Sequence, residues 1–264
     1  MGHTGETFRG GALVPFGIGI GQVVRLVRET RELEDSRAQI VVSGTGAREL
    51  AVALAAGGDP GAVSVDGDPL RAAVAICLVE GEPSAAENAA LRRISRAGTP
   101  VIVVRRGGAE HIPHVLPEDV LEIGREVPVA ELAAAIARAA SDIAPSLAAR
   151  LPLLRPAVTR RLIGMTALAN AAIAASPRVK QAHVPLLTLA QTRMVLLLGL
   201  SRGDVLPHNP QDLAVAAGPA FAGSLGVGLG ARSLVRRLPV RGPLVRAAVA
   251  YAGTRVLGAA RLRL

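Results

Sequence analysis

Aromatic side chains are scarce in this chain. They make up 2% of its 264 residues, tryptophan is absent, and Phe221 and Tyr251 are the only two beyond residue 150. Proteins that bind single-stranded nucleic acid stack its bases on aromatic side chains set among basic ones. Nucleic acid is therefore disfavoured as a partner, although the net charge is +9.

Cysteine is nearly absent, and no export signal is expected. Cys77 is the single cysteine, which excludes a disulfide framework and a thiolate metal site, and we expect no metal site of another kind. No basic stretch followed by a long apolar core and a small-residue cleavage site opens the chain, so no export signal is expected.

The charges are divided unevenly between the two halves. Residues 1–150 hold 15 Arg against 19 Asp or Glu, whereas residues 151–264 hold 15 Arg or Lys against two Asp. The mean hydropathy is +0.39 and half of all residues are hydrophobic. A basic, apolar second half is suited to anionic lipid headgroups or to an acidic protein partner.

Residues 38–141 alternate short β-rich runs with helical patterns. The expected strands cover residues 39–42, 62–65, 74–79, 101–104 and 120–123, and the expected helices follow a glycine loop at 44–46 and cover 84–97 and 129–140. Such alternation predicts an α/β domain with a parallel sheet and helices on both faces. Residues 1–37 are expected to form an N-terminal arm.

Composition changes at residues 142–161, where Pro145, Pro152 and Pro156 punctuate an Arg- and Leu-rich stretch. We predict a linker there, followed by an all-α, apolar and basic domain at 162–264. Its expected helices cover residues 162–175, 186–200, 213–231 and 244–262.

The segment 213–231 carries no charge and would extend about 28 Å as a helix, close to the thickness of a bilayer core. Its alanines and glycines make membrane insertion marginal, so a buried helix in a soluble bundle is an open alternative. Small residues recur every four positions on one face, where another helix, including that of a second copy, could approach closely. They include Gly218, Ala222, Gly226 and Gly230.

The glycine loop lacks the residues of a nucleotide-hydrolysing P-loop. Gly46 could be its second glycine, but Ala47 and Arg48 stand where Lys and Ser or Thr belong. Residues 105–108 read Arg-Arg-Gly-Gly where a GTPase carries Asn-Lys-x-Asp. We therefore predict no catalytic residues, and enzymatic activity is not expected.

Two binding alternatives stay open for this loop. Gly44, Thr45, Gly46 and Arg48 could hold a phosphate through free amides and a guanidinium. Alternatively, Gly44-x-Gly46 with Asp66, 20 residues after Gly46, has the spacing of a dinucleotide site, although Glu49 occupies the third glycine position. The simplest interpretation is a tight turn with no cofactor.

The order of these elements, with the phrase Ala97-Gly98-Thr99-Pro100-Val101-Ile102-Val103-Val104, resembles the Era-like branch of small GTPases over about residues 38–140. The resemblance implies a pseudo-GTPase that keeps the fold for packing or for binding a protein partner.

The second half resembles the YcjF-type uncharacterised domain of bacteria over about residues 160–260. Four phrases carry the resemblance: Thr166-Ala167-Leu168-Ala169-Asn170, Pro185-Leu186-Leu187-Thr188, Gln191-Thr192-Arg193-Met194-Val195 and Ala250-Tyr251-Ala252-Gly253-Thr254-Arg255. It implies membrane association behind a GTPase-like domain, and hence the cytoplasmic face of the bacterial inner membrane, with the cytoplasm as alternative.

The sequence therefore supports two functional hypotheses. The first is a non-catalytic scaffold that binds a protein through residues 38–141 and an anionic membrane surface or a membrane protein through residues 162–264. The second is a nucleotide-binding sensor or weak NTPase that uses the Gly44–Arg48 loop.

Overall fold

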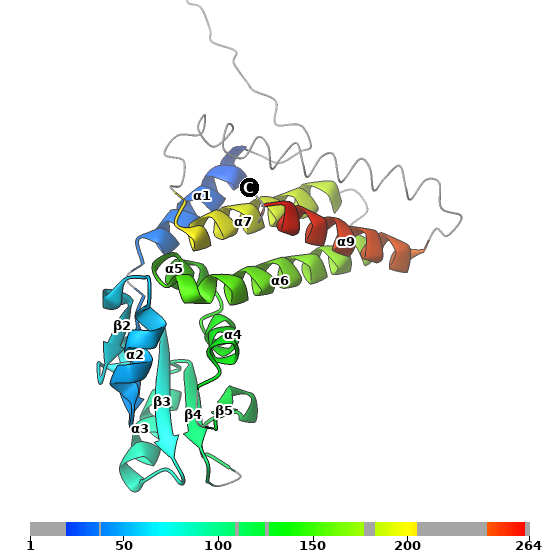
Figure 1. Cartoon of the computed structure of the whole chain (residues 1–264). Helices are drawn as coiled ribbons and strands as arrows, with labels where there is room; N and C mark the ends of the chain where they lie inside the picture. The colour runs from blue at the N-terminus through cyan, green and yellow to red at the C-terminus, as the bar shows by residue number, and fades with distance from the viewer. Residues whose placement is uncertain are drawn as a thin grey trace, which may run out of the picture.

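The computed structural model describes residues 20–36, 38–108, 111–124, 127–176, 183–204 and 242–261. Five parallel strands form one sheet of order β2-β1-β3-β4-β5 (Figure 1). This confirms the expected α/β fold with a parallel sheet, and the strand order is one of the two common in doubly wound proteins. The strands are β1 (Ile40–Gly44), β2 (Val63–Val65), β3 (Val74–Glu80), β4 (Val101–Arg106) and β5 (Val120–Glu122).

Helices account for most of the other described residues. The α-helices are α1 (Ile20–Glu34), α2 (Ala47–Ala55), α3 (Ala85–Arg96), α4 (Val129–Ala139), α5 (Ala144–Arg150), α6 (Arg155–Ala175), α7 (His183–Arg202) and α9 (Pro243–Arg261). Short 3-10 helices stand at η1 (Pro60–Ala62), η2 (Pro69–Arg71), η3 (Pro117–Asp119) and η4 (Pro152–Leu154). The chain therefore passes from β2 to β3 and from β4 to β5 through 3-10 turns in place of α-helices.

The sheet is buried on both faces. Six successive residues of β3 are buried, as expected for a central strand covered on both sides. One face packs against α2, α4 and α5, and the other packs against α3 and the segment 111–116.

The apolar core of the first face extends well past the sheet. Leu147, Leu151 and Leu154 are completely buried and belong to the same cluster as Ile40 and Ile76 of the central strands. Residues 142–161, expected to be a linker, thus form α5, η4 and the beginning of α6.

The prolines of this segment explain why its composition resembled a linker. Pro145, Pro152 and Pro156 each stand in the first two positions of a helix. Proline is favoured there because the first amides of a helix have no intrahelical acceptor in any case. Each proline therefore begins a new helix in this segment.

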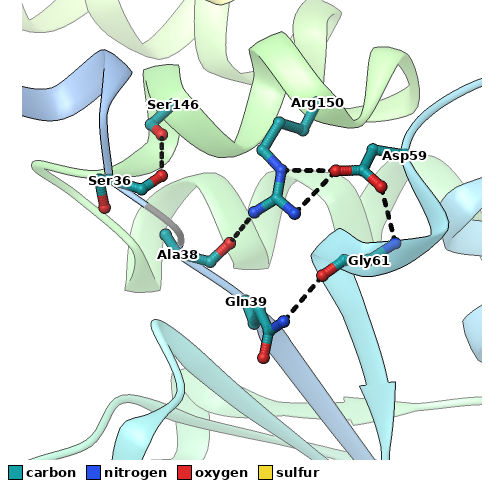
Figure 2. Close-up of polar contacts among 7 residues, drawn as sticks. All are labelled: Ser36, Ala38, Gln39, Asp59, Gly61, Ser146 and Arg150. Atoms are coloured by element: carbon teal, nitrogen blue, oxygen red, sulfur yellow. Dashed lines mark hydrogen bonds and ion pairs between the residues drawn. The ribbon is translucent and has the colours of Figure 1, made fainter. Parts of the chain in front are cut away.

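A polar network joins α5 to the amino ends of β1 and β2 (Figure 2). Arg150 donates to Asp59 Oδ2 from Nε at 2.9 Å and from Nη2 at 2.8 Å, and its Nη1 donates to the Ala38 carbonyl at 2.6 Å. The Gly61 amide donates to Asp59 Oδ1 at 2.8 Å. The hydrogen bond from Arg150, followed by that from Gly61, lowers the pKa of Asp59.

Backbone contacts tighten the same junction. The Asp59 amide donates to the Arg150 carbonyl at 2.9 Å, and a Cβ on Gly58 would stand only 2.4 Å from that oxygen. Ser146 Oγ donates to the Ser36 carbonyl at 3.3 Å. Helix α5 is therefore fixed against the amino edge of the sheet by both core packing and hydrogen bonds.

Helices α6, α7 and α9 lie beyond that amino edge, and the strand arrowheads point away from them (Figure 1). Helix α6 packs along both α7 and α9. Helices α7 and α9 begin and end within three residues of the helices expected at 186–200 and 244–262. Helix α6 ends where the helix expected at 162–175 ends, but it begins seven residues earlier, at Arg155. Segment 213–231 and its small-residue face lie outside the described residues. The N-terminal arm includes α1, which packs on α7 and α5 and buries Leu26.

The contact between α6 and α9 is close and partly polar. A Cβ on Gly258 would stand 2.6 Å from the Ile163 side chain, so only glycine allows this approach. Asn170 Nδ2 donates to Thr254 Oγ1 at 2.9 Å, and both side chains are completely buried. Two of the phrases that resemble the YcjF-type domain therefore meet in space.

The shared core predicts that α5 and η4 stabilise the whole sheet. We expect Leu151→Ala to lower the free energy of unfolding by about 2–5 kcal/mol, because it leaves a cavity in that core. The control Leu168→Ala, at a side chain 58% exposed, should change it by less than about 0.5 kcal/mol. Urea unfolding followed by circular dichroism measures both, and equally small effects would contradict the shared core.

The lowered pKa of Asp59 predicts a pH-dependent contribution to stability. It is fully present above the unfolded-state pKa of about 3.9 and is lost as the pH falls through the lower folded-state value. Asp59→Asn should therefore lower the Tm at pH 7, and its difference from the unsubstituted protein should shrink below about pH 4.

Asp68→Asn is the matched control for this measurement. Asp68 also caps a 3-10 turn, because its Oδ1 accepts a hydrogen bond from the Leu70 amide at 3.1 Å. Its ion pair with Arg71 is longer, at 3.7 Å between Nε and Oδ2. We expect a smaller loss of Tm at pH 7 for this variant. An unchanged Tm for Asp59→Asn would show that the network does not stabilise the fold.

Candidate functional site

The carboxyl ends of the five strands meet at one edge, where doubly wound proteins bind their ligands. The chain leaves β1 toward β2 on one side and later continues to β3 on the other, so the switch point lies between β1 and β3. The glycine loop follows β1 at this point, and Val42 pairs with Val65 immediately before Asp66. The structure thus brings Gly44, Thr45, Gly46, Arg48 and Asp66 to one edge of the sheet.

Gly44 has a packing role that needs no ligand. Its φ is +99°, and a Cβ would stand 2.1 Å from the carbonyl oxygen of Leu78 on the neighbouring strand β3. A side chain here would force β1 and β3 apart. The first glycine of the loop is therefore explained by strand pairing.

Gly46 provides the turn into α2. Its φ of +81° is left-handed, as favoured by glycine, and its carbonyl accepts from the Leu50 amide at 3.1 Å. Glu49 Oε2 lies 3.9 Å from the place that a Cβ on Gly46 would take. A phosphate at this helix start would meet the Glu49 carboxylate, which already occupies the favourable N-terminal position for a negative charge.

The remaining loop and edge residues are accessible. Thr45, Arg48 and Asp66 are exposed. Asp66 has φ of 54° and its amide donates to the Val42 carbonyl at 2.9 Å, which continues the pairing of β1 and β2.

The second helix start at this edge also carries its own carboxylate. At α3, Ser84 Oγ accepts from the Glu87 amide at 3.2 Å, and Glu87 Oε2 accepts from the Ser84 amide at 2.7 Å. This capping box, expected from the sequence, satisfies two of the amides that could otherwise bind an anion.

The described part of this edge carries more carboxylates than arginines. Arg106 is held by Glu80 at 3.5 Å and by the Gly124 carbonyl at 3.2 Å, and Arg105 is buried against Glu122. Carboxylates of the described loops and helix starts at this edge include Glu49, Asp66, Glu80, Glu82 and Glu87. Negative charge at this edge repels the phosphates of a nucleotide.

Cys77 lies on β3 beside this loop but is not built as a nucleophile. Burial raises the pKa of its thiol above the ordinary value, outweighing the hydrogen bond that Ser43 Oγ donates to Sγ at 3.6 Å. The reactive thiolate is therefore disfavoured. Within the described ranges, His, Cys, Asp and Glu form no group of three or more that could hold a metal ion.

Three helices beyond the opposite edge of the sheet have the reverse charge. Helices α6, α7 and α9 contain three, two and three arginines and no Asp or Glu. Exposed apolar side chains stand between them, among them Met165 and Leu168 on α6 and Leu244 and Val256 on α9. None of the helices in the described part of the chain is long and apolar enough to span a bilayer.

Apolar and basic residues share single stripes on these helices. On α9, Leu244, Tyr251 and Arg255 follow one another at helical spacing and are all exposed. Sequence reasoning noticed the basic charge of this half but did not single out any of these arginines as site residues.

Together, the fold and this edge define a doubly wound α/β protein whose glycine loop serves strand pairing and helix initiation. Comparison with protein-family models, with curated proteins and with solved structures found no match. The resemblances to Era-like GTPases and to the YcjF-type domain therefore stay predictions.

The packing role of Gly44 predicts a large cost for any side chain at this position. We expect Gly44→Ala to destabilise the protein by about 2–5 kcal/mol, from the strained φ and the clash with Leu78. Gly57→Ala is the control, since φ there is +69° but nothing lies within 4 Å, and should cost about 1–2 kcal/mol. Equal losses in urea unfolding would mean that β1 and β3 can separate to admit a side chain.

Proposed function

We propose that the protein is a non-catalytic scaffold that binds an anionic membrane surface through its basic helices. In this proposal residues 162–264 serve as a helical membrane-associated domain, and the α/β part, a degenerate GTPase-like domain, binds a protein partner. The observation that carries the proposal is the absence of carboxylates from α6, α7 and α9, which combine arginines with exposed apolar side chains.

The arrangement of the two charged ends supports this division of roles. The acidic carboxyl edge of the sheet faces away from the basic helices (Figure 1). When arginines approach anionic lipid, the acidic edge stays away from the lipid, because the charge of a bilayer surface acts over about one Debye length. The acidic edge then remains accessible to a basic segment of a partner on the cytoplasmic face of the bacterial inner membrane.

A nucleotide sensor is the second hypothesis, and the loop geometry favours it less. Gly44 is needed because a side chain there would clash with the Leu78 carbonyl oxygen. The Glu49 carboxylate lies near the helix start where a phosphate would bind. Arg48 is the one arginine of the loop.

Vesicle sedimentation tests the membrane proposal. We expect the full chain to bind vesicles of phosphatidylglycerol and phosphatidylcholine, to release them as ionic strength rises, and to bind phosphatidylcholine alone much more weakly. Arg246→Glu with Arg255→Glu on α9 should lower the partition coefficient more than about tenfold, since each arginine near the surface contributes to attraction.

The matched control reverses two exposed charges on the α/β part, Arg92→Glu with Arg96→Glu on α3, and should leave binding nearly unchanged. Equal loss for both pairs would mean that net charge alone attracts the protein. No vesicle binding, together with GTP, ATP or NAD binding that Arg48→Glu removes, would overturn the scaffold in favour of the nucleotide sensor.

A further inference from the structure

A groove of about 330 Å³ runs between α6 and α7 and is closed at one end by the turn from α4 to α5. Its α6 residues extend from Val158 to Ala169, which corresponds to about 17 Å of helix. The volume is at the lower end of the range for small-molecule sites, about 300–1,000 Å³. It is too small to enclose an α-helix of that length, which is about 10 Å across.

The walls of this α6–α7 groove are mainly apolar. Leu162 and Met165 on α6 and Met194 and Leu197 on α7 supply flexible aliphatic and thioether surface. Met194 and Leu197 are buried, whereas Met165 is 55% exposed. An apolar chain bound along the groove would cover Met165 and remove apolar surface from water.

Two arginines line the same groove. Arg161 on α6 and Arg193 on α7 make no hydrogen bond or ion pair with any residue that the structure describes. The one carboxylate of the lining is Asp142, on the turn that closes the groove. Neither α6 nor α7 contains an acidic residue, so neither helix supplies a carboxylate to these guanidinium groups.

We propose that the α6–α7 groove binds one acidic phospholipid of the bilayer surface, with its phosphate held by Arg161 and Arg193 and an acyl chain along Met165 and Leu197. Guanidinium groups match phosphate oxygens with paired hydrogen bonds. Their aliphatic stems pack on apolar neighbours while the charged heads reach the headgroup level. The proposal rests on the proposed membrane association for the source of this lipid.

Methionine methyl groups report directly on the groove. The chain has three methionines, and two of them, Met165 and Met194, line it. We would label the methyl carbons of the full chain, assign them with Met165→Leu, and titrate monomeric dihexanoyl-phosphatidylglycerol below its micelle concentration. We expect saturable shifts of both methyl signals while the Met1 signal stays constant.

Matched variants separate the groove from general charge. Arg161→Gln with Arg193→Gln should weaken the binding at least about tenfold, because two charge-assisted contacts are lost. Arg246→Gln with Arg255→Gln removes the same charge from the exposed face of α9 and should change it less than about twofold. Dihexanoyl-phosphatidylcholine should bind at least about tenfold more weakly than the acidic lipid.

A second pair tests the shape without changing charge. Ala169→Phe places a ring in the groove and should abolish the methyl shifts, whereas Ala172→Phe, exposed on α6 and outside the lining, should retain them. Both proteins are first compared by circular dichroism and thermal unfolding. Retained methyl shifts in a folded Ala169→Phe protein would overturn the proposal that the lipid binds in the groove.

The outcomes distinguish this proposal from the proposed function. Methyl shifts without vesicle binding would support lipid binding in the groove and contradict the proposed membrane scaffold. Vesicle binding lowered equally by both glutamine pairs, without methyl shifts, would keep the scaffold and overturn the groove. Equal affinity for the phosphatidylcholine and phosphatidylglycerol probes would also overturn it, because the arginines would then have no role.

Discussion

The apolar core that the sheet shares with α5, η4 and the start of α6 is the constraint on which the other features depend. Leu147, Leu151 and Leu154 are completely buried with the central strands, so these helices cannot leave without exposing one face of the sheet. Arg150 and Asp59 then fix the direction in which α6 departs, because they join α5 to the residues that precede β1 and β2. The basic helices are thereby held at the amino edge, opposite the strand ends.

That placement gives the molecule two chemically different ends. At the carboxyl edge, Glu49 and Glu87 occupy the first turns of α2 and α3, and Gly44 is required for the approach of β1 to β3. At the other end, α6, α7 and α9 carry eight arginines and contain no Asp or Glu. Carboxylates thus stand at the edge where this fold commonly binds nucleotides, whereas arginines without acidic residues on the same helices stand beyond the opposite edge.

The strands and helices of the α/β part could be predicted because their signals are local. Buried strands read as continuous apolar runs, glycines end helices, and Ser84 with Glu87 marks a helix start. The role of Pro145 could not be read locally, since the same residue opens a helix or interrupts a loop. The Arg150–Asp59 contact joins positions 91 residues apart, and the reason for Gly44 is a carbonyl on another strand. The site residues were found at one edge, but their purpose depends on neighbours distant in the chain.

Chain order gives the shared core a consequence for biosynthesis. The strands leave the ribosome before α5, η4 and α6, yet these later segments supply part of the apolar cover of the first face. A ribosome adds about 5–20 residues per second. One face of the nascent sheet therefore lacks part of its apolar cover for a second or more. During this interval its exposed strands are accessible to other nascent chains, and a chaperone that covers the face until α6 emerges would prevent their association.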